Sequence, residues 1–444
     1  MPRQFCIAWV LAAGLLASGA NSYEMSFLHA YELARSEAPE LVLARLQVDS
    51  AEAQKGVARG RLLPQVSLFG QFSDNQVEYG AGTAGGYRDN FRGERYGLQV
   101  SQTIFNVADA LELSRLDLVY QQSQEEFHVA ERELISLLVQ TYLKVLLAES
   151  ELISYETELL ALQTQQAESN ALYKKKLVPV TDILEIQSRV DALVADVTMA
   201  VGEVAVAREE LYQLTGQRNV DLVPVNDLVT LIASPGSIEE AAVAGVINSP
   251  AVSAAEKAVS AAQKGVDRER GSWIPQVDLT YVYQTADVGF DNLRTPSRDT
   301  STVAIGFNYP LFEGGAKLAR LRGARAEYSS AKIRLEAEKK RTESRARSAW
   351  LNSEATAKRV VAARKAVISA QTHLDASNKA MRLGTTTATE VLIALSQSTK
   401  ANKDYLRARF QYIQGWVELE LAIGTNPQHL ALTLSEALHR GVSE

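Results

Sequence analysis

Apolar side chains recur at helical spacing through a long stretch in the first half of the chain. Leu134, Leu138 and Tyr142 follow one another at intervals of four, and no glycine interrupts residues 98–201. This pattern predicts a helix over about 108–173, which would be about 100 Å long at roughly 1.5 Å per residue. A helix of that length needs a partner to pack against.

The partner helix follows after a short interruption. Residues 177–179 break the helical pattern, and residues 181–214 resume it with many alanines that permit close approach. We therefore predict an antiparallel helical hairpin over about 106–216, with its tip near 174–180.

The second half of the chain repeats this arrangement. An outgoing helix is predicted over 316–381, a tip near 383–385 and a returning helix over 390–423, so that the second hairpin spans about 316–424. Thr181-Asp-Ile-Leu184 matches Thr389-Glu-Val-Leu392 at an offset of 208 residues. The chain therefore contains two copies of one structural repeat. We divide it into a first repeat (21–216), an inter-repeat equatorial segment (217–249), a second repeat (250–424) and a C-terminal equatorial segment (425–444).

Between its first helix and its long hairpin, each repeat contains a pair of stretches with strand periodicity. Val277, Leu279, Tyr281 and Tyr283 alternate with mostly polar residues, and so do apolar residues of 303–309. The alternation is weaker over 96–104 and weakest over 66–72. These observations predict strand pairs over about 66–105 and about 277–311, joined internally by long polar loops at 73–95 and 285–301.

The first twenty residues have the features of a secretory signal peptide, with Arg3, a 13-residue apolar run and small residues before position 21. No later stretch matches a membrane helix, so a mature chain that enters a bilayer must do so as closed β-structure. Strands of about ten residues have a suitable length. Four strands are too few for a membrane barrel, whose smallest single-chain form has about eight. A barrel must therefore be shared between chains, and geometry alone allows two, three or more copies.

Composition excludes several classes of function. The net charge of −7 argues against a nucleic-acid partner. The single cysteine, Cys6, lies in the predicted signal peptide, and the five histidines have no metal-ligand spacing. The G-x-G-x-x-G match at 80–85 lies between two strands rather than before a helix, so we interpret it as a loop. We expect no cofactor, no metal and no enzyme activity.

Local motifs resemble those of the TolC-like outer-membrane efflux and type I secretion family. Leu98-Gln-Val-Ser-Gln-Thr-Ile-Phe105 and Tyr309-Pro-Leu-Phe-Glu-Gly-Gly315 resemble the family's exits from the second and fourth strands. Leu177-Val-Pro-Val-Thr-Asp-Ile183 and Leu383-Gly-Thr-Thr-Thr-Ala-Thr-Glu-Val391 resemble its two hairpin tips. The resemblance covers about 38–424.

The resemblance implies a mainly α-helical fold with a β-barrel. Three copies would share one barrel of twelve transmembrane strands in the bacterial outer membrane, and their antiparallel coiled-coil hairpins would form a periplasmic tunnel. It further implies a passive channel for efflux or type I secretion. Its partners would be outer-membrane lipid, a periplasmic adaptor (membrane fusion) protein and an inner-membrane ABC or proton-driven pump. The alternative is an exported coiled-coil scaffold without a barrel, which would leave the four amphipathic strands unexplained.

The resemblance also implies that the tips contact the adaptor. The residues concerned are Lys176, Leu177, Val178, Thr181, Leu383, Gly384 and Thr385. Lys176 stands where the family has glycine, and a non-glycine residue resists a positive φ angle. Either the first turn is built differently, or Lys176 accepts the strain. The run Lys174-Lys-Lys176 is either an ordinary solvated surface or part of this contact.

A pore constriction is implied just beyond the tips. Asp182 and Glu390 begin the two returning helices, and Glu185 lies one turn after Asp182. In a trimer these carboxylates would form rings that favour cations. The competing interpretation is that they only stabilise the N-terminal dipoles of their helices. The family's second acidic position is Ile393 here, so we expect the gate to close more by packing of Ile393 and Met381 than by ion pairs.

Overall fold

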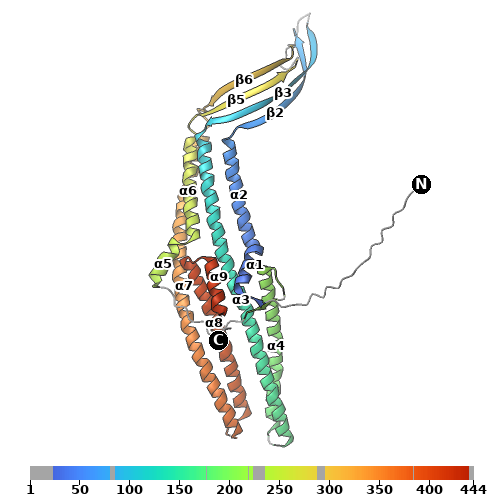
Figure 1. Cartoon of the computed structure of the whole chain (residues 1–444), viewed down its shortest axis with the longest axis vertical. Coiled ribbons are helices and arrows are strands. Elements are labelled where there is room, and N and C mark those ends of the chain that lie inside the picture. Colours follow the sequence, from blue (N-terminus) through green and yellow to red (C-terminus); the bar gives the residue numbers. More distant parts are fainter. Residues whose placement is uncertain are drawn as a thin grey trace, which may run out of the picture.

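The computed structural model describes residues 24–80, 86–176, 178–218, 220–223, 236–287, 296–383 and 385–439. The predicted signal peptide lies outside these residues. The molecule is strongly elongated, with one β-sheet at one end and the tips of two helical hairpins at the other (Figure 1). Three short helices, α1 (Phe27–Glu37), α5 (Ile238–Ile247) and α9 (Pro427–His439), lie near mid-length with the two-residue parallel pair of β1 (Glu24–Met25) and β4 (Asp221–Leu222).

The two predicted hairpins are present with nearly the expected bounds. α3 (Val107–Lys174) returns as α4 (Val180–Thr215), and α7 (Ala316–Arg382) returns as α8 (Ala388–Ile423). The Asn106 side chain caps α3 by accepting a hydrogen bond from the Asp109 amide at 3.1 Å. Both outgoing helices also continue above the hairpins toward the sheet.

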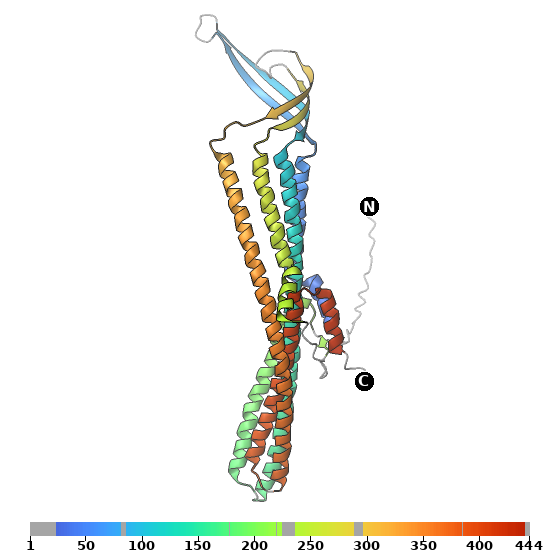
Figure 2. The ribbon, with the colours of Figure 1, turned by 90° about the vertical axis from the view of Figure 1, so that its left-hand side faces the viewer.

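The upper part of the molecule is a wall of four helices. α2 (Pro39–Arg61) packs on α3, α3 on α6 (Pro250–Gly271) and α6 on the upper half of α7. The order across the wall is therefore α2, α3, α6, α7, with α2 and α7 as its free flanks. Figure 2 shows these helices ending at a similar height beneath the sheet.

The sheet contains both predicted strand pairs in one antiparallel layer. Its order is β2 (Gln65–Tyr79), β3 (Tyr87–Phe105), β5 (Gln276–Ala286) and β6 (Arg298–Asn308). The predicted loop at 73–95 is wrong over most of its length, because β2 and β3 continue through it. Polar cross-strand partners hold this extension, including Arg88 at 3.5 Å from Glu78 and the Tyr79 and Tyr87 rings stacked at 4.9 Å. The predicted loop at 285–301 is likewise too long at both ends.

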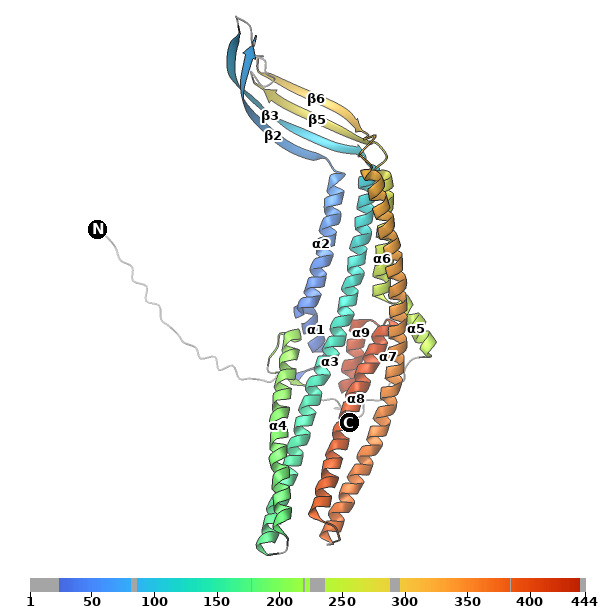
Figure 3. The ribbon, with the colours of Figure 1, turned by 180° about the vertical axis from the view of Figure 1, so that it is seen from behind.

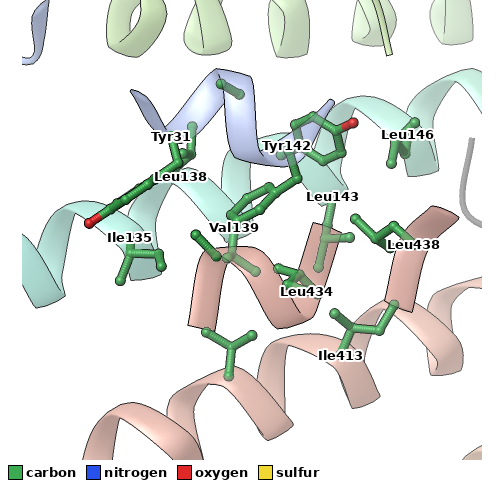
Figure 4. Close-up of a cluster of buried hydrophobic side chains, with 14 of the residues drawn as sticks. Tyr31, Ile135, Leu138, Val139, Tyr142, Leu143, Leu146, Ile413, Leu434 and Leu438 are labelled. Carbon is green, nitrogen blue, oxygen red and sulfur yellow. The ribbon is translucent and has the colours of Figure 1, made fainter. Parts of the chain in front are cut away.

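The main hydrophobic core lies where the hairpins meet α1 and α9 (Figure 4). Tyr142 of α3 is fully buried there. Its hydroxyl donates to the Met25 carbonyl at 3.1 Å, and its ring packs perpendicular to that of Phe27 with the ring centroids 5.4 Å apart. Burial raises the pKa of Tyr142 well above its usual range. This contact attaches the N-terminal segment to the longest helix.

A half-buried arginine of α3 joins the C-terminal ends of two helices beside this core. The Arg132 guanidinium donates to the carbonyls of Leu421 at 3.4 Å, Gly424 at 3.2 Å and Asn248 at 3.3 Å. These carbonyls lie at the C-terminal ends of α8 and α5, where a cation also complements the helix dipole. Desolvation lowers the pKa of Arg132.

A charged network ties α3 to α6 just below the sheet. Glu112 accepts from Arg115 at 2.7 Å and from Arg268 of α6 at 3.0 Å. Arg268 also pairs with Glu269, which is itself 3.8 Å from Arg320 of α7. Arg115 and then Arg268 lower the pKa of Glu112 to about 2 against the opposing effect of burial. The network therefore spans three of the four wall helices.

We predict that Glu112→Gln lowers stability at neutral pH by about 1–2 kcal/mol, because Arg115 and Arg268 lose a charged acceptor. The folded pKa of Glu112 lies below its unfolded value, so its contribution is present above pH 4.5 and is lost as the pH falls toward 2. The difference in thermal midpoint between the variant and the parent should shrink over that window. Glu354→Gln, which removes a surface partner of Lys358, is the control. A difference in thermal midpoint that does not change with pH would contradict the lowered pKa of Glu112 in the folded protein.

Candidate functional site

The features that bear on function lie at the two ends of the molecule (Figure 3). One is the sheet, and the other is the pair of hairpin tips. About a hundred ångströms of helix separate them, since α3 alone has 68 residues.

One face of the sheet is apolar and exposed. The strand register aligns Val66, Val100, Tyr281 and Val303 in one row across all four strands. Other rows of the same face add Leu68, which is 83% exposed, and Phe307, which is 80% exposed. Exposure of large side chains at this level is unusual for a surface in water. This face is suited to contact with lipid.

The opposite face of the sheet is mostly polar. The row next to Val66 contains Ser67, Gln99, Val282 and Thr302, and the following row contains Ser101 and Thr280. Alternation between an apolar and a polar face is the pattern of a barrel strand that separates lipid from a wet interior. Within the described residues, β2 and β6 each have a neighbour on one side only.

The first hairpin tip contains a strained lysine. Lys176 has a φ of +61° and is the only non-glycine residue with positive φ in the described ranges. Its amide donates to the Tyr173 carbonyl at 2.7 Å. Of the two alternatives drawn from the sequence, the structure has the second, in which lysine adopts the conformation that glycine favours. Val178 is half-buried and Thr181 is exposed, whereas Leu177 lies outside the described residues.

The second tip exposes a leucine at its apex. Leu383 is 80% exposed, and its amide donates to the Lys379 carbonyl at 3.2 Å. Thr385 closes the turn, with its amide and its hydroxyl each 3.0 Å from the Ala380 carbonyl. Gly384 lies outside the described residues.

The three acidic residues predicted near the mouth all accept hydrogen bonds from threonines. Asp182 accepts from Thr181 at 3.3 Å, and Glu390 from Thr386 at 2.6 Å. The Glu390 amide donates to Thr387 at 3.3 Å, which makes Thr387 the N-cap of α8. These contacts fit the helix-dipole interpretation, and a pore role stays a prediction.

Glu185 has a further role, because it connects the two hairpins. It accepts a hydrogen bond from the Thr389 hydroxyl of α8 at 2.8 Å. Met381 of α7 also reaches the first hairpin, with its sulfur 3.9 Å from the Gln165 amide nitrogen. Ile393 is half-exposed on α8. The structure thus brings Glu185 and Thr389 together, while a packed gate of Met381 and Ile393 stays a prediction.

Two glutamates of α3 that are buried against neighbouring helices were not identified from the sequence. Glu151 and Glu158 of α3 are only 7% and 5% exposed. Glu151 accepts from Arg407 of α8 at 2.6 Å and raises the pKa of that arginine. Glu158 lies 3.5 Å from Arg189 of α4, which also donates to Ser396 of α8 at 2.8 Å.

The seven-residue spacing of these glutamates places them on one face of α3. That spacing is the one feature of the sequence that could have identified them. A carboxylate buried in this way is stable only while its arginine is present. Glu151 with Arg407 therefore joins the first hairpin to the second. Glu158 with Arg189 joins the two helices of the first hairpin, and Arg189 reaches the second hairpin through Ser396.

In the described ranges, no helix combines the length and the apolarity that crossing a membrane requires. The same ranges contain no grouping of three or more histidine, cysteine or acidic residues that could hold a metal ion.

Comparison with known proteins gives one consistent family. The profile of the family described as "Outer membrane efflux protein" matches residues 30–217 and 246–425. The chain is 24% identical to outer membrane protein TolC of Escherichia coli K12, over 97% of this chain and 89% of TolC. It is 22% identical to the alkaline protease secretion protein AprF of Pseudomonas aeruginosa, over 96% of this chain and 89% of AprF.

A solved structure of a membrane protein from Pseudomonas aeruginosa has the same fold. It superposes with a TM-score of 0.79 at 18% identity and covers 91% of this chain and 94% of that protein. The family profile covers both halves of the chain, including the sheet and the two hairpins. The chain therefore belongs to the outer membrane efflux protein family.

Proposed function

We propose that three copies of this outer-membrane channel protein share one twelve-stranded barrel and conduct cargo passively from the periplasmic side. The observation that carries this proposal is a four-stranded sheet with an apolar face and two open edges, mounted on helices about 100 Å long. Lipid offers no hydrogen bonds to an open strand edge, so each edge needs a strand from another copy.

The helical wall supports the same arrangement. Its flanking helices expose apolar side chains in the part of the chain described: Val42, Leu46 and Val57 on α2, and Leu318 and Ile333 on α7. α2 runs toward the sheet and α7 runs away from it, so α2 of one copy and α7 of the next would pack antiparallel. Strand β2 of one copy would pair with β6 of the next in the same assembly. The number of copies, three, is taken from the resemblance to the family and not from the sheet or the wall.

The hairpin tips are the proposed contact with a periplasmic adaptor, which would couple the channel to an inner-membrane ABC or proton-driven pump. The exposed Leu383 and Thr385 of one tip and Lys176, Val178 and Thr181 of the other support this proposal. We extend it to Leu177 and Gly384 by their position in the chain. AprF is a secretion protein, and the family is an efflux family, so both types of cargo fit the proposal.

We further propose that Asp182, Glu185 and Glu390 form acidic rings at the periplasmic mouth, beside Met381 and Ile393. Three-fold symmetry would bring each acid close to its own copies. An exported scaffold without a barrel is not favoured, because it would not need the exposed apolar face of the sheet. The relatives that match are outer-membrane and secretion proteins, and we propose no catalytic step.

We predict that copies can be linked through their wall flanks. In a Val57→Cys/Leu318→Cys variant, a short bismaleimide should join α2 of one copy to α7 of the next. Denaturing electrophoresis should then show a ladder that ends at three chains. Each single variant should stay monomeric. Val206→Cys, exposed on α4, replaces Val57→Cys in the control pair and should give no ladder. A ladder that ends at two chains, or passes three, would contradict the trimer.

We predict that Asp182→Asn/Glu390→Gln lowers cation selectivity in planar bilayers and weakens block by divalent cations severalfold, because two rings of charge are removed. The matched control is Asp196→Asn/Glu203→Gln, which neutralises two exposed acids higher on α4. The control should keep the parent selectivity. If the first variant also keeps it, Asp182 and Glu390 do not line the pore.

A further inference from the structure

The junction between the sheet and the helices exposes a collar of large apolar side chains. Every chain crossing between the helical wall and the sheet contributes to it. Its members are Leu63, Phe105, Trp273, Ile274, Leu311 and Phe312. The last two are 87% and 86% exposed, although they lie in a short connection beside the polar N-terminus of α7. Such side chains at the end of a membrane sheet are typical of the interface between hydrocarbon and headgroups.

A basic layer lies directly beneath this collar. The segments 55–63, 105–117, 264–274 and 313–325 together contain eleven basic and six acidic residues, a net charge of +5. The whole chain has a net charge of −7. Positive charge is therefore concentrated at the level of the helix ends that face the sheet (Figure 2).

Most of the acids in this layer are already bound to its cations. Glu112 and Glu269 are shared by Arg115, Arg268 and Arg320, and Lys317 lies 3.7 Å from Glu313. Lys55 and Asp117 also pair. The cations in these contacts are therefore neutralised by acids of the wall itself.

Four arginines remain exposed, and their side chains make no hydrogen bond or ion pair with any residue that the structure describes. They are Arg59 and Arg61 on α2, and Arg322 and Arg325 on α7. Both pairs lie on the free flanks of the wall. Arg61 is the last residue of α2, and Arg322 lies six residues into α7, about 9 Å along its axis. An arginine side chain can reach upward from this depth into the headgroup layer.

We propose that the four arginines form an anionic phospholipid site in the periplasmic leaflet of the outer membrane, one at each contact between copies. This inference rests on the proposed assembly, in which α2 and α7 of adjacent copies meet. The guanidinium groups would bind the headgroup phosphate, and the apolar collar would contact the upper acyl chains. Lipid is the occupant because the basic layer adjoins the apolar sheet face and its collar without a gap.

Trp273 provides a probe for this site. It lies in the collar and is 45% exposed, whereas Trp416 is buried in the core. Trimers would be reconstituted into vesicles of phosphatidylcholine that contain a small fraction of lipid brominated high on its acyl chain. Quenching by brominated phosphatidylcholine reports whether the collar contacts lipid at all. Extra quenching by brominated phosphatidylglycerol at the same fraction reports preference for an anionic headgroup. Trp273→Phe defines the background.

The parent should show extra quenching by phosphatidylglycerol that falls as salt is raised. Arg322→Gln/Arg325→Gln should weaken the apparent affinity for phosphatidylglycerol by roughly tenfold or more, since each basic residue near an anionic surface contributes on the order of 1 kcal/mol. Quenching by phosphatidylcholine should not change. Arg59→Gln/Arg61→Gln should act in the same direction.

The matched control is Lys340→Gln/Lys365→Gln, which removes two exposed, unpaired cations from α7 far below the junction. Lys340 is 24 residues from the start of α7, about 36 Å away and well beyond the screening length. Equal quenching by the two lipids in the parent would overturn the lipid site and leave the channel intact. The lipid site would also be overturned if the control variant lost as much affinity for phosphatidylglycerol as Arg322→Gln/Arg325→Gln. Absence of quenching by either lipid would contradict the membrane barrel itself.

Discussion

The proposed assembly depends on the backbone hydrogen bonds that the sheet leaves open among the residues described for one chain. Within the described part of the chain, β2 and β6 each have a neighbour on one side only, and Val66 and Phe307 expose apolar side chains at these two edges. In water such a sheet would aggregate, and in lipid each open edge would leave several polar groups unpaired. The free apolar stripes of α2 and α7 lie on the corresponding flanks of the wall. In the proposed assembly, the same contact between copies would complete both the barrel and the helical wall.

The helices below the sheet must pack the two hairpins together and leave the hairpin tips exposed. Along most of their length this is done by apolar packing, but polar contacts set specific points. The buried carboxylate of Glu151 pairs with the half-exposed Arg407 of the other hairpin, and that of Glu158 pairs with the half-exposed Arg189 of the same hairpin. Such pairs add little net stability, yet removing the arginine leaves a buried carboxylate unpaired. The Glu151 pair therefore favours one arrangement of the two hairpins, and the Glu158 pair favours one position of α4 on α3. Near the hairpin tips, the hydrogen bond from Thr389 to Glu185 connects the two hairpins at the surface.

Much of this fold is legible in the sequence, because long helices and repeats leave strong periodic signals. The bounds of α3 and α7 were predicted to within one or two residues. The ends of β2 and β3 were not, because Glu78 and Arg88 satisfy each other across the ladder and look like loop residues when read singly. Glu151 was missed for a related reason, since its arginine is 256 residues away. The conformation of Lys176 required the structure, because sequence could only state that its φ angle would be costly.

The central claim is that the edges of the sheet are paired between copies. Hydrogen–deuterium exchange, measured on the assembled protein and on chains dissociated in detergent, tests it most directly. In the assembly, amides of β2 and β6 should be as protected as those of β3 and β5. On dissociation, the outward-facing amides of β2 and β6 should exchange quickly, while those between β3 and β5 should keep much of their protection. Fast exchange at both edges in the assembly would contradict the account, and so would edges that stay equally protected in single chains.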